Sequence, residues 1–351
     1  MLPLLNRLFS GKISMVALSG GVAAYERGDQ PTARRLLAIA SSAAPRDAVL
    51  HEQAAAAASR AGDHRMTLDL LTNLLRSQPE NNELQLRAAI AQTNLGDAPG
   101  AAQRCEEAIA RSSAERDPSA LLGLLAGLRL PGPSRAELLS AIHNWLRPRT
   151  YVEIGVAEGA SLLLTAPGTR AIGVDPAPSI TRPLPPDTTV YAETSDDFFA
   201  SRDVRALLGG LPIEVGFIDG MHLFEFALRD FMNLERLCTP DSTILFDDCI
   251  PADRRSAGRD RTTDFWTGDV WRVIPALKKY RPDLRIHTIA ASPTGLCVVR
   301  GLDPASRVIA ENHDAIVKEF LALDYSALEP DKTKFLNVFP NDWERIKEIL
   351  R

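Results

Sequence analysis

The stretch Tyr151-Val-Glu-Ile154, followed at once by Gly155-Val-Ala-Glu-Gly159, decides the fold of the C-terminal two-thirds of the chain. The aromatic and β-branched residues of 151–154 predict a short strand. Gly155 permits a sharp turn with the backbone close to a ligand, and Gly159 lets a helix start nearby. We therefore expect a strand, a glycine turn and a helix in succession.

Strands and helices alternate on both sides of this segment. The further predicted strands cover residues 171–174, 188–192, 215–218, 243–246, 285–289 and 296–299. The predicted helices cover residues 135–146, 196–208, 224–237, 270–279, 308–323 and 343–350. This alternation predicts an α/β fold with a mainly parallel, doubly wound, Rossmann-like sheet. Ligands of such sheets bind beyond the carboxyl ends of the strands, where the strand order switches.

A carboxylate, Asp175, ends the second predicted strand, where it can accept hydrogen bonds from ribose hydroxyls. A nicotinamide dinucleotide would require G-x-G-x-x-G, but this chain has Ala157 in place of the middle glycine and an anionic Glu158 beside it. A carboxylate there would repel a diphosphate but is tolerated beside the cationic methionine portion of S-adenosylmethionine. The glycine turn with Asp175 resembles class I S-adenosylmethionine-dependent methyltransferases.

The resemblance implies a set of cofactor contacts, of which Gly155 and Asp175 are carried over most directly. Ser195 and Asp196 follow the third predicted strand, where that family contacts adenine. Ser195 could equally be the N-cap of a helix. The cofactor-binding candidates are Glu153, Gly155, Gly159, Asp175, Ser195 and Asp196.

Three carboxylates stand at the ends of the fourth and fifth predicted strands, Asp219 on one and Asp247-Asp248 on the other. Crowded carboxylates repel one another unless they are protonated, hydrogen-bonded or neutralised by a cation. Oxygen ligands of this kind suit Mg²⁺. The alternative is that one aspartate bonds loop amides while its neighbour touches the cofactor.

The sequences I-D-G-x-H over 218–222 and Asp247-Asp248 resemble metal-dependent O-methyltransferases, including the catechol enzymes and, more closely, the macrocin-type sugar enzymes of bacteria. The resemblance implies that Asp219, Asp247 and Asp248 hold Mg²⁺, which promotes deprotonation of a substrate hydroxyl. It also implies that His222 takes the proton. A histidine that opens a helix can instead cap it or bond the neighbouring carboxylates. Catechol enzymes often have Asn in place of Asp248, so the aspartate favours the sugar-modifying branch.

One further residue and one further segment are predicted beside this edge of the sheet. Asp230, in the helix that follows the fourth strand, is expected to be an ordinary surface charge. The aromatic segment 264–271 could stack on an acceptor ring and close the site. Alternatively, Thr267 or Asp269 caps a helix and Trp271 lies in the core.

The first third of the chain contains a repeat with a period of 34 residues, marked by Gly-Asp pairs. The glycine suits a tight turn between antiparallel helices, a small residue after it allows close packing, and a proline ends the second helix. Over residues 14–115 the pattern resembles tetratricopeptide repeats, without that family's large aromatics. It implies either a surface for a protein partner or a cover for the enzyme. The markers are Gly28-Asp29, Gly62-Asp63 and Gly96-Asp97, then Ala33, Thr67 and Ala101, and Pro45 and Pro79 with Ser113 in the third position.

These patterns predict a helical repeat domain over 1–130, a methyltransferase domain over 131–304 and a helical extension over 305–351. The hinge is expected at Pro131-Gly-Pro133. Apolar groups of Phe335–Phe339 are expected to dock on a domain or on the second subunit of a homodimer.

Composition limits the classes of function. The net charge is −5 without a long basic stripe, which argues against a nucleic-acid binder; the short cluster 254–261 could also be a solvated loop. The four cysteines are scattered, which argues against a zinc or disulfide framework. The longest apolar run, 121–130, is too short for a membrane span, and the N-terminus lacks a signal-peptide pattern. We therefore expect a cytoplasmic protein.

The sequence thus predicts an Mg²⁺-dependent O-methyltransferase that uses S-adenosylmethionine to methylate a hydroxyl of a saccharide or small molecule. One alternative is an interaction scaffold in which the repeats are the working part. Another is metal-independent methylation of nitrogen or carbon.

Overall fold

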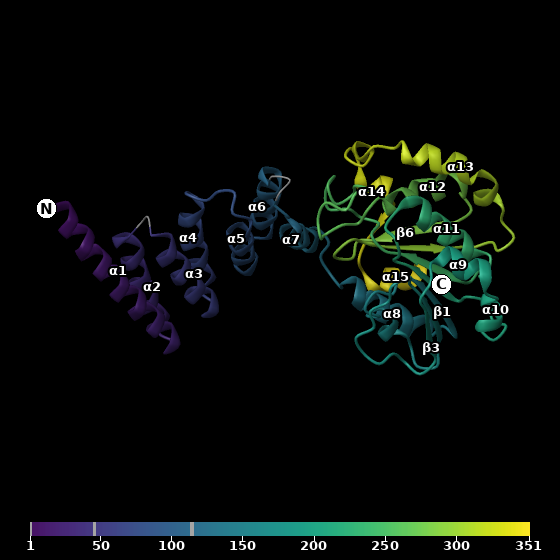
Figure 1. Ribbon diagram of the computed structural model, residues 1–351, viewed down its shortest axis with the longest axis horizontal. Helices are drawn as coiled ribbons and strands as arrows, with labels where there is room; N and C mark the ends of the chain where they lie inside the picture. The colour runs from purple at the N-terminus through teal and green to yellow at the C-terminus, as the bar shows by residue number, and fades with distance from the viewer. Residues whose placement is uncertain (1, 45–46, 113–115) are drawn as a thin grey trace. The chain divides into compact units, whose positions relative to one another are not determined.

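The computed structural model describes residues 2–44, 47–112 and 116–351. The chain divides into two compact units, Met1–Arg129 and Leu130–Arg351, drawn in Figure 1. Among the described residues, no helix is long and apolar enough to cross a membrane.

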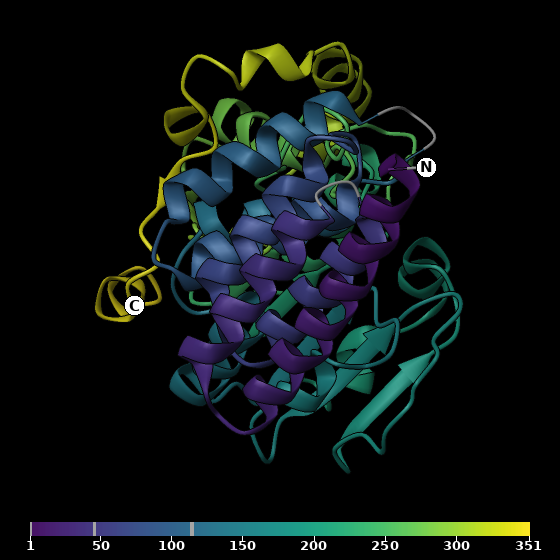
Figure 2. The same ribbon diagram turned by 90° about the vertical axis from the view of Figure 1, so that its left-hand side faces the viewer.

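The first unit consists of helices that pack on one another in chain order, from purple to blue in Figure 2. Its helices are α1 (Leu2–Glu26), α2 (Gln30–Ala43), α3 (Ala48–Arg60), α4 (His64–Leu75), α5 (Asn82–Asn94), α6 (Ala98–Arg111) and α7 (Ser119–Arg129). The 34-residue period of the sequence therefore corresponds to one helix pair.

The Gly-Asp pairs build the turns inside these helix pairs. Each glycine has a positive φ, for example 71° at Gly62, a conformation that other residues adopt only with strain. Each aspartate then caps the next helix; Asp63 accepts the backbone N–H of Met66 at 3.2 Å. The small residue that follows is buried in every repeat. Pro79 lies in the turn beyond the end of α4, and Pro45 and Ser113 lie outside the described residues.

The second unit is built on one mixed sheet, which in the described residues has the strand order β3-β2-β1-β4-β5-β7-β6-β8. Strands β1 to β5 pair in parallel, and β7 runs antiparallel to both of its neighbours. The strands are β1 (Thr150–Ile154), β2 (Arg170–Val174), β3 (Thr188–Tyr191), β4 (Val215–Ile218), β5 (Thr243–Phe246), β6 (Arg285–Ile289), β7 (Leu296–Arg300) and β8 (Val338–Phe339). This confirms the predicted α/β class.

Helices cover both faces of the sheet, as Figure 1 shows. One face packs against α8 (Arg135–Leu146) and α15 (Trp343–Ile349), with Ile142 and Ile346 fully buried beside strand residues. The other face carries the larger core. Its helices are α9 (Ser195–Ser201), α10 (Val204–Leu207), α11 (Phe224–Glu235), α12 (Val273–Tyr280) and α13 (Val308–Leu321).

Two helices differ from their prediction. The segment after Gly159 forms only the short 3₁₀ turn η1 (Leu162–Leu164) instead of an α-helix. Pro167 follows closely and disfavours the helical conformation of the residue before it, so the turn cannot extend. The helix predicted over 196–208 is broken into α9 and α10, because Asp203 leaves the helix and caps a new one through the N–H of Ala206.

In the C-terminal tail, the predicted docking on a domain takes the form of strand pairing. The segment expected to dock through exposed apolar groups contains β8, which pairs in parallel with β6 and becomes the edge of the sheet. The predicted helix at 270–279 begins as the 3₁₀ turn η2 (Val270–Arg272). Two short elements precede β8, η3 (Tyr325–Ala327) and α14 (Lys332–Phe335).

Candidate active site

A cavity of about 1070 Å³ opens at the carboxyl ends of β1, β2, β4 and β5. Strand β1 lies between β2 and β4, so the connections run in opposite directions from this point. This is the switch in strand order where doubly wound sheets bind their ligands. The cavity has a glycine loop at one end and a cluster of charged side chains at the other.

The glycine loop depends on close contact between two backbones. Gly155 has a φ of 87°, and a Cβ there would lie 1.9 Å from the carbonyl oxygen of Asp219. Its N–H donates to the carbonyl of Val174 at 2.9 Å. Only glycine therefore fits, because any side chain would push the ends of β1 and β4 apart.

Asp175 holds this loop from the end of β2. Its Oδ2 accepts the backbone N–H groups of Val156 at 2.9 Å and Ala157 at 2.8 Å, and its Oδ1 accepts that of Ala177 at 2.8 Å. The side chain also lines the cavity. A carboxylate oxygen can accept more than one hydrogen bond, so these backbone contacts still leave room for a hydrogen bond from a ribose hydroxyl. That contact stays a prediction.

Glu153 and Gly159 lie behind the loop, and neither belongs to the cavity lining among the described residues. The fully buried carboxyl of Glu153 accepts hydrogen bonds from the hydroxyls of Tyr151 at 2.6 Å and Ser161 at 2.5 Å. Burial raises the pKa of Glu153 to about 8, against the lowering effect of these hydrogen bonds. A direct contact of Glu153 or Gly159 with the cofactor therefore stays a prediction.

Ser195 and Asp196 both line the cavity at the start of α9. The N-cap of this helix is Thr194, whose hydroxyl accepts the N–H of Asp197 at 3.1 Å, so the interpretation of Ser195 as the cap is wrong. Asp196 pairs with Arg229 through both carboxylate oxygens, at 3.2 and 2.8 Å.

Asp230 was expected on the surface, and that expectation is wrong, because the residue is 3% exposed and lines the cavity. Its Oδ1 has no hydrogen-bond partner in the described part of the chain. Burial raises the pKa of Asp230 to about 7. Its spacing from the buried Ala227 and Leu234 places it on the apolar face of α11, which is a signal present in the sequence.

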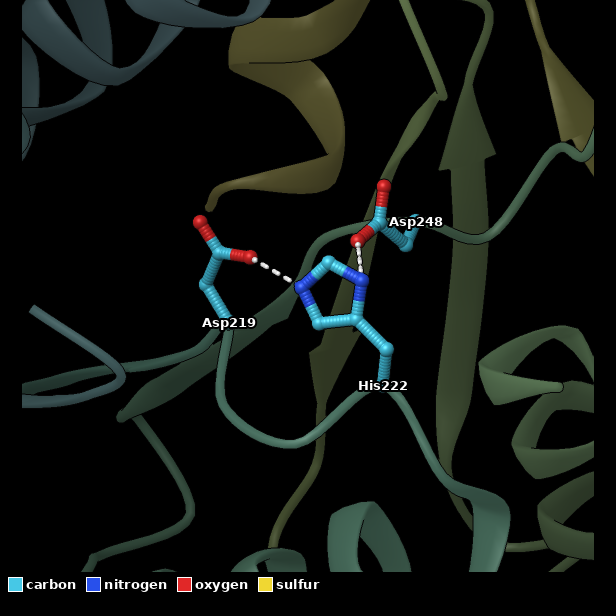
Figure 3. A group of neighbouring side chains, drawn as sticks. All are labelled: Asp219, His222 and Asp248. Carbon is cyan, nitrogen blue, oxygen red and sulfur yellow. Dashed lines mark ion pairs between the residues drawn. The ribbon is translucent and has the colours of Figure 1, made fainter. Parts of the chain in front are cut away.

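At the other end, His222 lies between two carboxylates, as Figure 3 shows. Its Nδ1 is 2.8 Å from Asp248 Oδ2, and its Nε2 is 3.4 Å from Asp219 Oδ1. One nitrogen of His222 and one oxygen of each aspartate all lie within 4.8 Å of one another. The fold therefore brings together three of the predicted site residues, Asp219, His222 and Asp248. Asp247 does not belong to this group.

The histidine ring is held in place by the segment 266–269. Trp266 stacks on it with ring centroids 5.3 Å apart, and the Trp266 carbonyl lies 3.1 Å from Nδ1. Burial alone would lower the pKa of His222, but the charge of Asp248 and hydrogen bonds to both carboxylates outweigh it and raise the pKa to about 10. The ring is therefore strongly basic and fixed in orientation.

Asp247 is neutralised by a residue that the sequence analysis did not single out. It is 2% exposed and forms an ion pair with Arg135 at the start of α8. The same guanidinium Nη1 is 3.3 Å from Asp219 Oδ2, and the Thr294 hydroxyl donates to Asp247 Oδ1 at 3.2 Å. Asp247 therefore has protein partners that compete with a role as a metal ligand. Nothing near Arg135 in the sequence marks it, because its partners lie far along the chain.

The aromatic segment after the basic loop is divided between the cavity and the core. Trp266 lines the cavity beside His222, whereas Trp271 is fully buried in the core. Asp269 caps α11 rather than its own helix, because it accepts the N–H of Phe224 at 2.7 Å.

The basic loop is paired within its own unit. Arg254 contacts Asp324 at 2.9 Å, and Arg259 contacts Glu225 at 2.6 Å. Two arginines of the loop are therefore held by acidic side chains of the same unit.

Three solved structures to which this chain is similar share 13–15% of its sequence. The O-methyltransferase TomG from Streptomyces achromogenes, involved in tomaymycin synthesis and solved with SAM, is 15% identical with a TM-score of 0.36, covering 48% of this chain and 80% of its own. An O-methyltransferase from Bacillus cereus, solved with SAH, is 14% identical with a TM-score of 0.35, covering 50% of this chain and 86% of its own. A putative O-methyltransferase from Klebsiella pneumoniae is 13% identical with a TM-score of 0.37, covering 52% and 87%.

No curated protein matches the sequence. A family model described as a methyltransferase domain matches residues 152–249. That range starts in β1, includes the glycine loop and ends one residue after Asp248. Through this segment the chain carries a methyltransferase domain.

Proposed function

We propose that this chain is an S-adenosylmethionine-dependent O-methyltransferase that methylates a hydroxyl of a saccharide or another small molecule. The observation that carries the proposal is that one cavity contains both a glycine loop held by Asp175 and a histidine base oriented by Asp248. When bound, S-adenosylmethionine supplies an activated methyl group. The protein must position that group and help to remove the proton of the acceptor hydroxyl.

The cofactor end has the features that such a molecule needs. Gly155 lines the cavity, and its close packing on the backbone of Asp219 holds the glycine loop at the ends of the strands. Glu158 lines the cavity, and its carboxylate suits the positive charge of a sulfonium. Asp230 presents a buried acceptor that lacks a partner in the described residues. These groups fit an adenosine-bearing cation.

His222 is the proposed base. Both groups beside Nδ1, the Asp248 carboxylate and the Trp266 carbonyl, are acceptors, so Nδ1 carries a proton. Nε2 is then the nitrogen that takes the proton of an acceptor hydroxyl. Because the pKa of His222 is raised to about 10, the ring carries both protons at neutral pH, so we expect it to act as the base once Nε2 has released its proton, most readily at alkaline pH.

Arg135 supports this arrangement electrostatically. Its guanidinium pairs with Asp247 and also faces Asp219, so it offsets negative charge at the ends of β4 and β5. Without it, a buried carboxylate would lie uncompensated beside the reacting groups. We infer that the positive charge of Arg135 keeps the acidic end ordered.

The resemblance to metal-dependent enzymes adds Mg²⁺ as a proposed cofactor, with a revised set of ligands. We propose that Asp219 and Asp248 would hold a divalent cation, since their carboxylate oxygens converge beside His222, and that Asp247 stays with Arg135. The ion would supply Lewis-acid stabilisation of a deprotonated hydroxyl. In calorimetric titrations with MgCl₂, Asp248→Asn should abolish binding and Asp247→Asn should retain it. Equal loss in both variants would restore Asp247 as a ligand.

The cofactor proposal is tested by titration with S-adenosylhomocysteine, the demethylated product. The wild type should bind it, and Asp175→Ala should bind at least about 10-fold more weakly, because two loop N–H groups lose their acceptor. Asp197→Ala is the matched control, since Asp197 belongs to the N-cap of α9 and does not line the described cavity.

The outcomes separate the alternatives. Absence of binding by the wild type to both S-adenosylmethionine and its product would favour an interaction scaffold built on the repeats. If Asp175→Ala binds S-adenosylhomocysteine as tightly as the wild type does, the cofactor proposal stands but the proposed role of Asp175 is wrong. If the enzyme transfers the methyl group to nitrogen or carbon without a metal, the proposal of a hydroxyl acceptor is wrong.

A further inference from the structure

The first helix of the repeat unit leaves a row of apolar residues uncovered. The row follows α1 at positions 13, 16, 20 and 23, and this alternation of three- and four-residue steps keeps it on one face of the helix. Val16 is 72% exposed and Ile13 is 51% exposed, and the two small residues of the row are partly exposed. We call this row the seam of α1; it consists of Ile13, Val16, Gly20 and Ala23.

The same positions are covered in the later repeats. One period of 34 residues after Val16 stands Leu50, and a second period on stands Leu84. These two side chains are 2% and 4% exposed and belong to a core cluster that the repeat helices share. The equivalents of the two small seam residues are also buried, namely Ala54 and Ala57 in α3 and Ala88 and Ala91 in α5.

The position of α1 in the row of helices explains the difference. α5 packs on α4 before it and on α6 after it, whereas α1 packs on α2 and α3, which both follow it. α1 is the end helix of this row in Figure 1. The seam is therefore a face that packs on another helix in the later repeats and that the described residues leave open on α1.

The shape of the seam indicates which helix would cover it. Its two large side chains lie in its N-terminal half and its two small residues in its C-terminal half. When a second copy of α1 lies antiparallel, Ile13 of one copy faces Ala23 of the other, and Val16 faces Gly20. Large side chains then fill the space that small residues leave. A two-fold axis repeats this fit, so one face serves both copies.

The charges on α1 support the same arrangement. Residues 13–25 contain no charged side chain, so two copies can approach along the seam without burying a charge. Lys12 and Glu26 are exposed and lie one residue outside this stretch, two coiled-coil heptads apart. In the antiparallel arrangement each Lys12 lies near Glu26 of the partner subunit. A parallel arrangement would instead place equal charges side by side.

We propose that the seam of α1 is the interface of a homodimer, in which α1 of one copy packs antiparallel on α1 of a second copy. The helix is 25 residues long, which gives a contact line of about 37 Å. A helix that lies on a lipid surface carries several Lys or Arg residues beside its apolar face, whereas residues 12–26 contain Lys12 alone. The inference concerns the repeat unit and is independent of the proposed methyl transfer.

The first test measures the mass of the full chain by sedimentation equilibrium over a range of concentrations. The wild type should form a dimer with a dissociation constant of about 10 μM or tighter, as expected for a small apolar interface. Val16→Asp should raise that constant at least about 100-fold, because it places a charge in the seam. Val49→Asp is the matched control, because Val49 is 65% exposed on α3 outside the seam, and it should leave the constant unchanged.

The second test determines the orientation of the two helices by cross-linking. The native cysteines are all buried, so introduced cysteines on α1 are the accessible thiols. A mixture of Ile13→Cys and Ala23→Cys proteins should form a disulfide-linked dimer under mild oxidation, and neither protein should do so alone. Efficient cross-linking of Ile13→Cys to itself would indicate a parallel pair and overturn the inference.

Thermal melting at a concentration where the proteins are monomeric checks that each variant folds. If Val16→Asp does not fold, Val16→Ser should still weaken the dimer at least about 10-fold. A wild type that stays monomeric at about 100 μM would overturn the inference, as would equal dimerisation of the wild type and a folded Val16 variant. Binding of a monomeric wild type to phosphatidylserine vesicles, lost in Val16→Asp, would overturn it in favour of a lipid surface.

Discussion

The two ends of the cavity are built in different ways. The cofactor end is made by the main chain: Gly155 packs against a neighbouring backbone, and Asp175 accepts loop N–H groups. The acidic end is made by side chains that meet from α8 and from the loops after β4 and β5. We therefore expect substitutions at the cofactor end to act through steric clash. Substitutions at the acidic end should act through loss of charge balance.

The largest effect is expected at Gly155. Gly155→Ala adds a methyl group that cannot avoid the carbonyl oxygen of Asp219 and places alanine at a φ of 87°. The variant should bind no S-adenosylhomocysteine by calorimetry and should lose about 3 kcal/mol or more of unfolding free energy in urea.

Gly168→Ala is the matched control for this substitution. Gly168 has a nearly equal φ of 84°, but nothing lies within 4 Å of its Cβ position. It should lose only about 1 kcal/mol, the cost of the backbone conformation. Equal losses in the two variants would show that backbone strain, and not close contact at the loop, is what Gly155 avoids.

A smaller effect is expected at Arg135. Arg135→Met keeps the length of the side chain but leaves buried Asp247 without its cationic partner. Breaking a pair with one buried member should cost about 2–3 kcal/mol of unfolding free energy, measured in urea. The double variant Arg135→Met/Asp247→Asn, which no longer contains the unpaired carboxylate, should recover part of that lost free energy of unfolding.

The matched control at the other end is Arg229→Met, which breaks the partly exposed pair with Asp196. It should cost less than about 1 kcal/mol. If it destabilises the protein as much as Arg135→Met does, the acidic end is no more dependent on charge balance than the protein surface.

A pH-dependent effect is expected at Glu153, beneath the glycine loop. Burial raises its pKa to about 8, so the folded protein holds a proton that the unfolded chain releases near 4.5. Its contribution to stability is thus full below pH 4.5 and is lost as the pH rises toward 8. The free energy of unfolding in urea of Glu153→Gln should equal that of the wild type near pH 5. It should exceed the wild-type value increasingly as the pH rises. A constant difference across this range would contradict the raised pKa.

The cofactor end could be predicted from the sequence because its markers are close together. The glycine turn and Asp175 lie within one strand-turn-strand segment, and parallel strands necessarily bring Asp219 and Asp248 to one edge. Residues whose partners are local, or fixed by sheet topology, leave a readable pattern.

The other partners could not be predicted in the same way. Arg135 reaches a carboxylate 84 residues away, and no local pattern encodes that pairing. Asp230 was misplaced for a different reason: its charge suggested the surface, although its position on the apolar face of α11 indicated burial. The edge strand β8 is too short for its alternation to be distinguished from a linker.

The most direct test of the account is transfer of an isotopically labelled methyl group from S-adenosylmethionine to a panel of saccharides and catechols. Products are identified by mass spectrometry and NMR for the wild type and for His222→Asn. The account predicts a labelled O-methyl product with the wild type and a rate at least about 100-fold lower with His222→Asn, while binding of S-adenosylhomocysteine is retained. A methyl group on nitrogen or carbon, or full activity in His222→Asn, would contradict it.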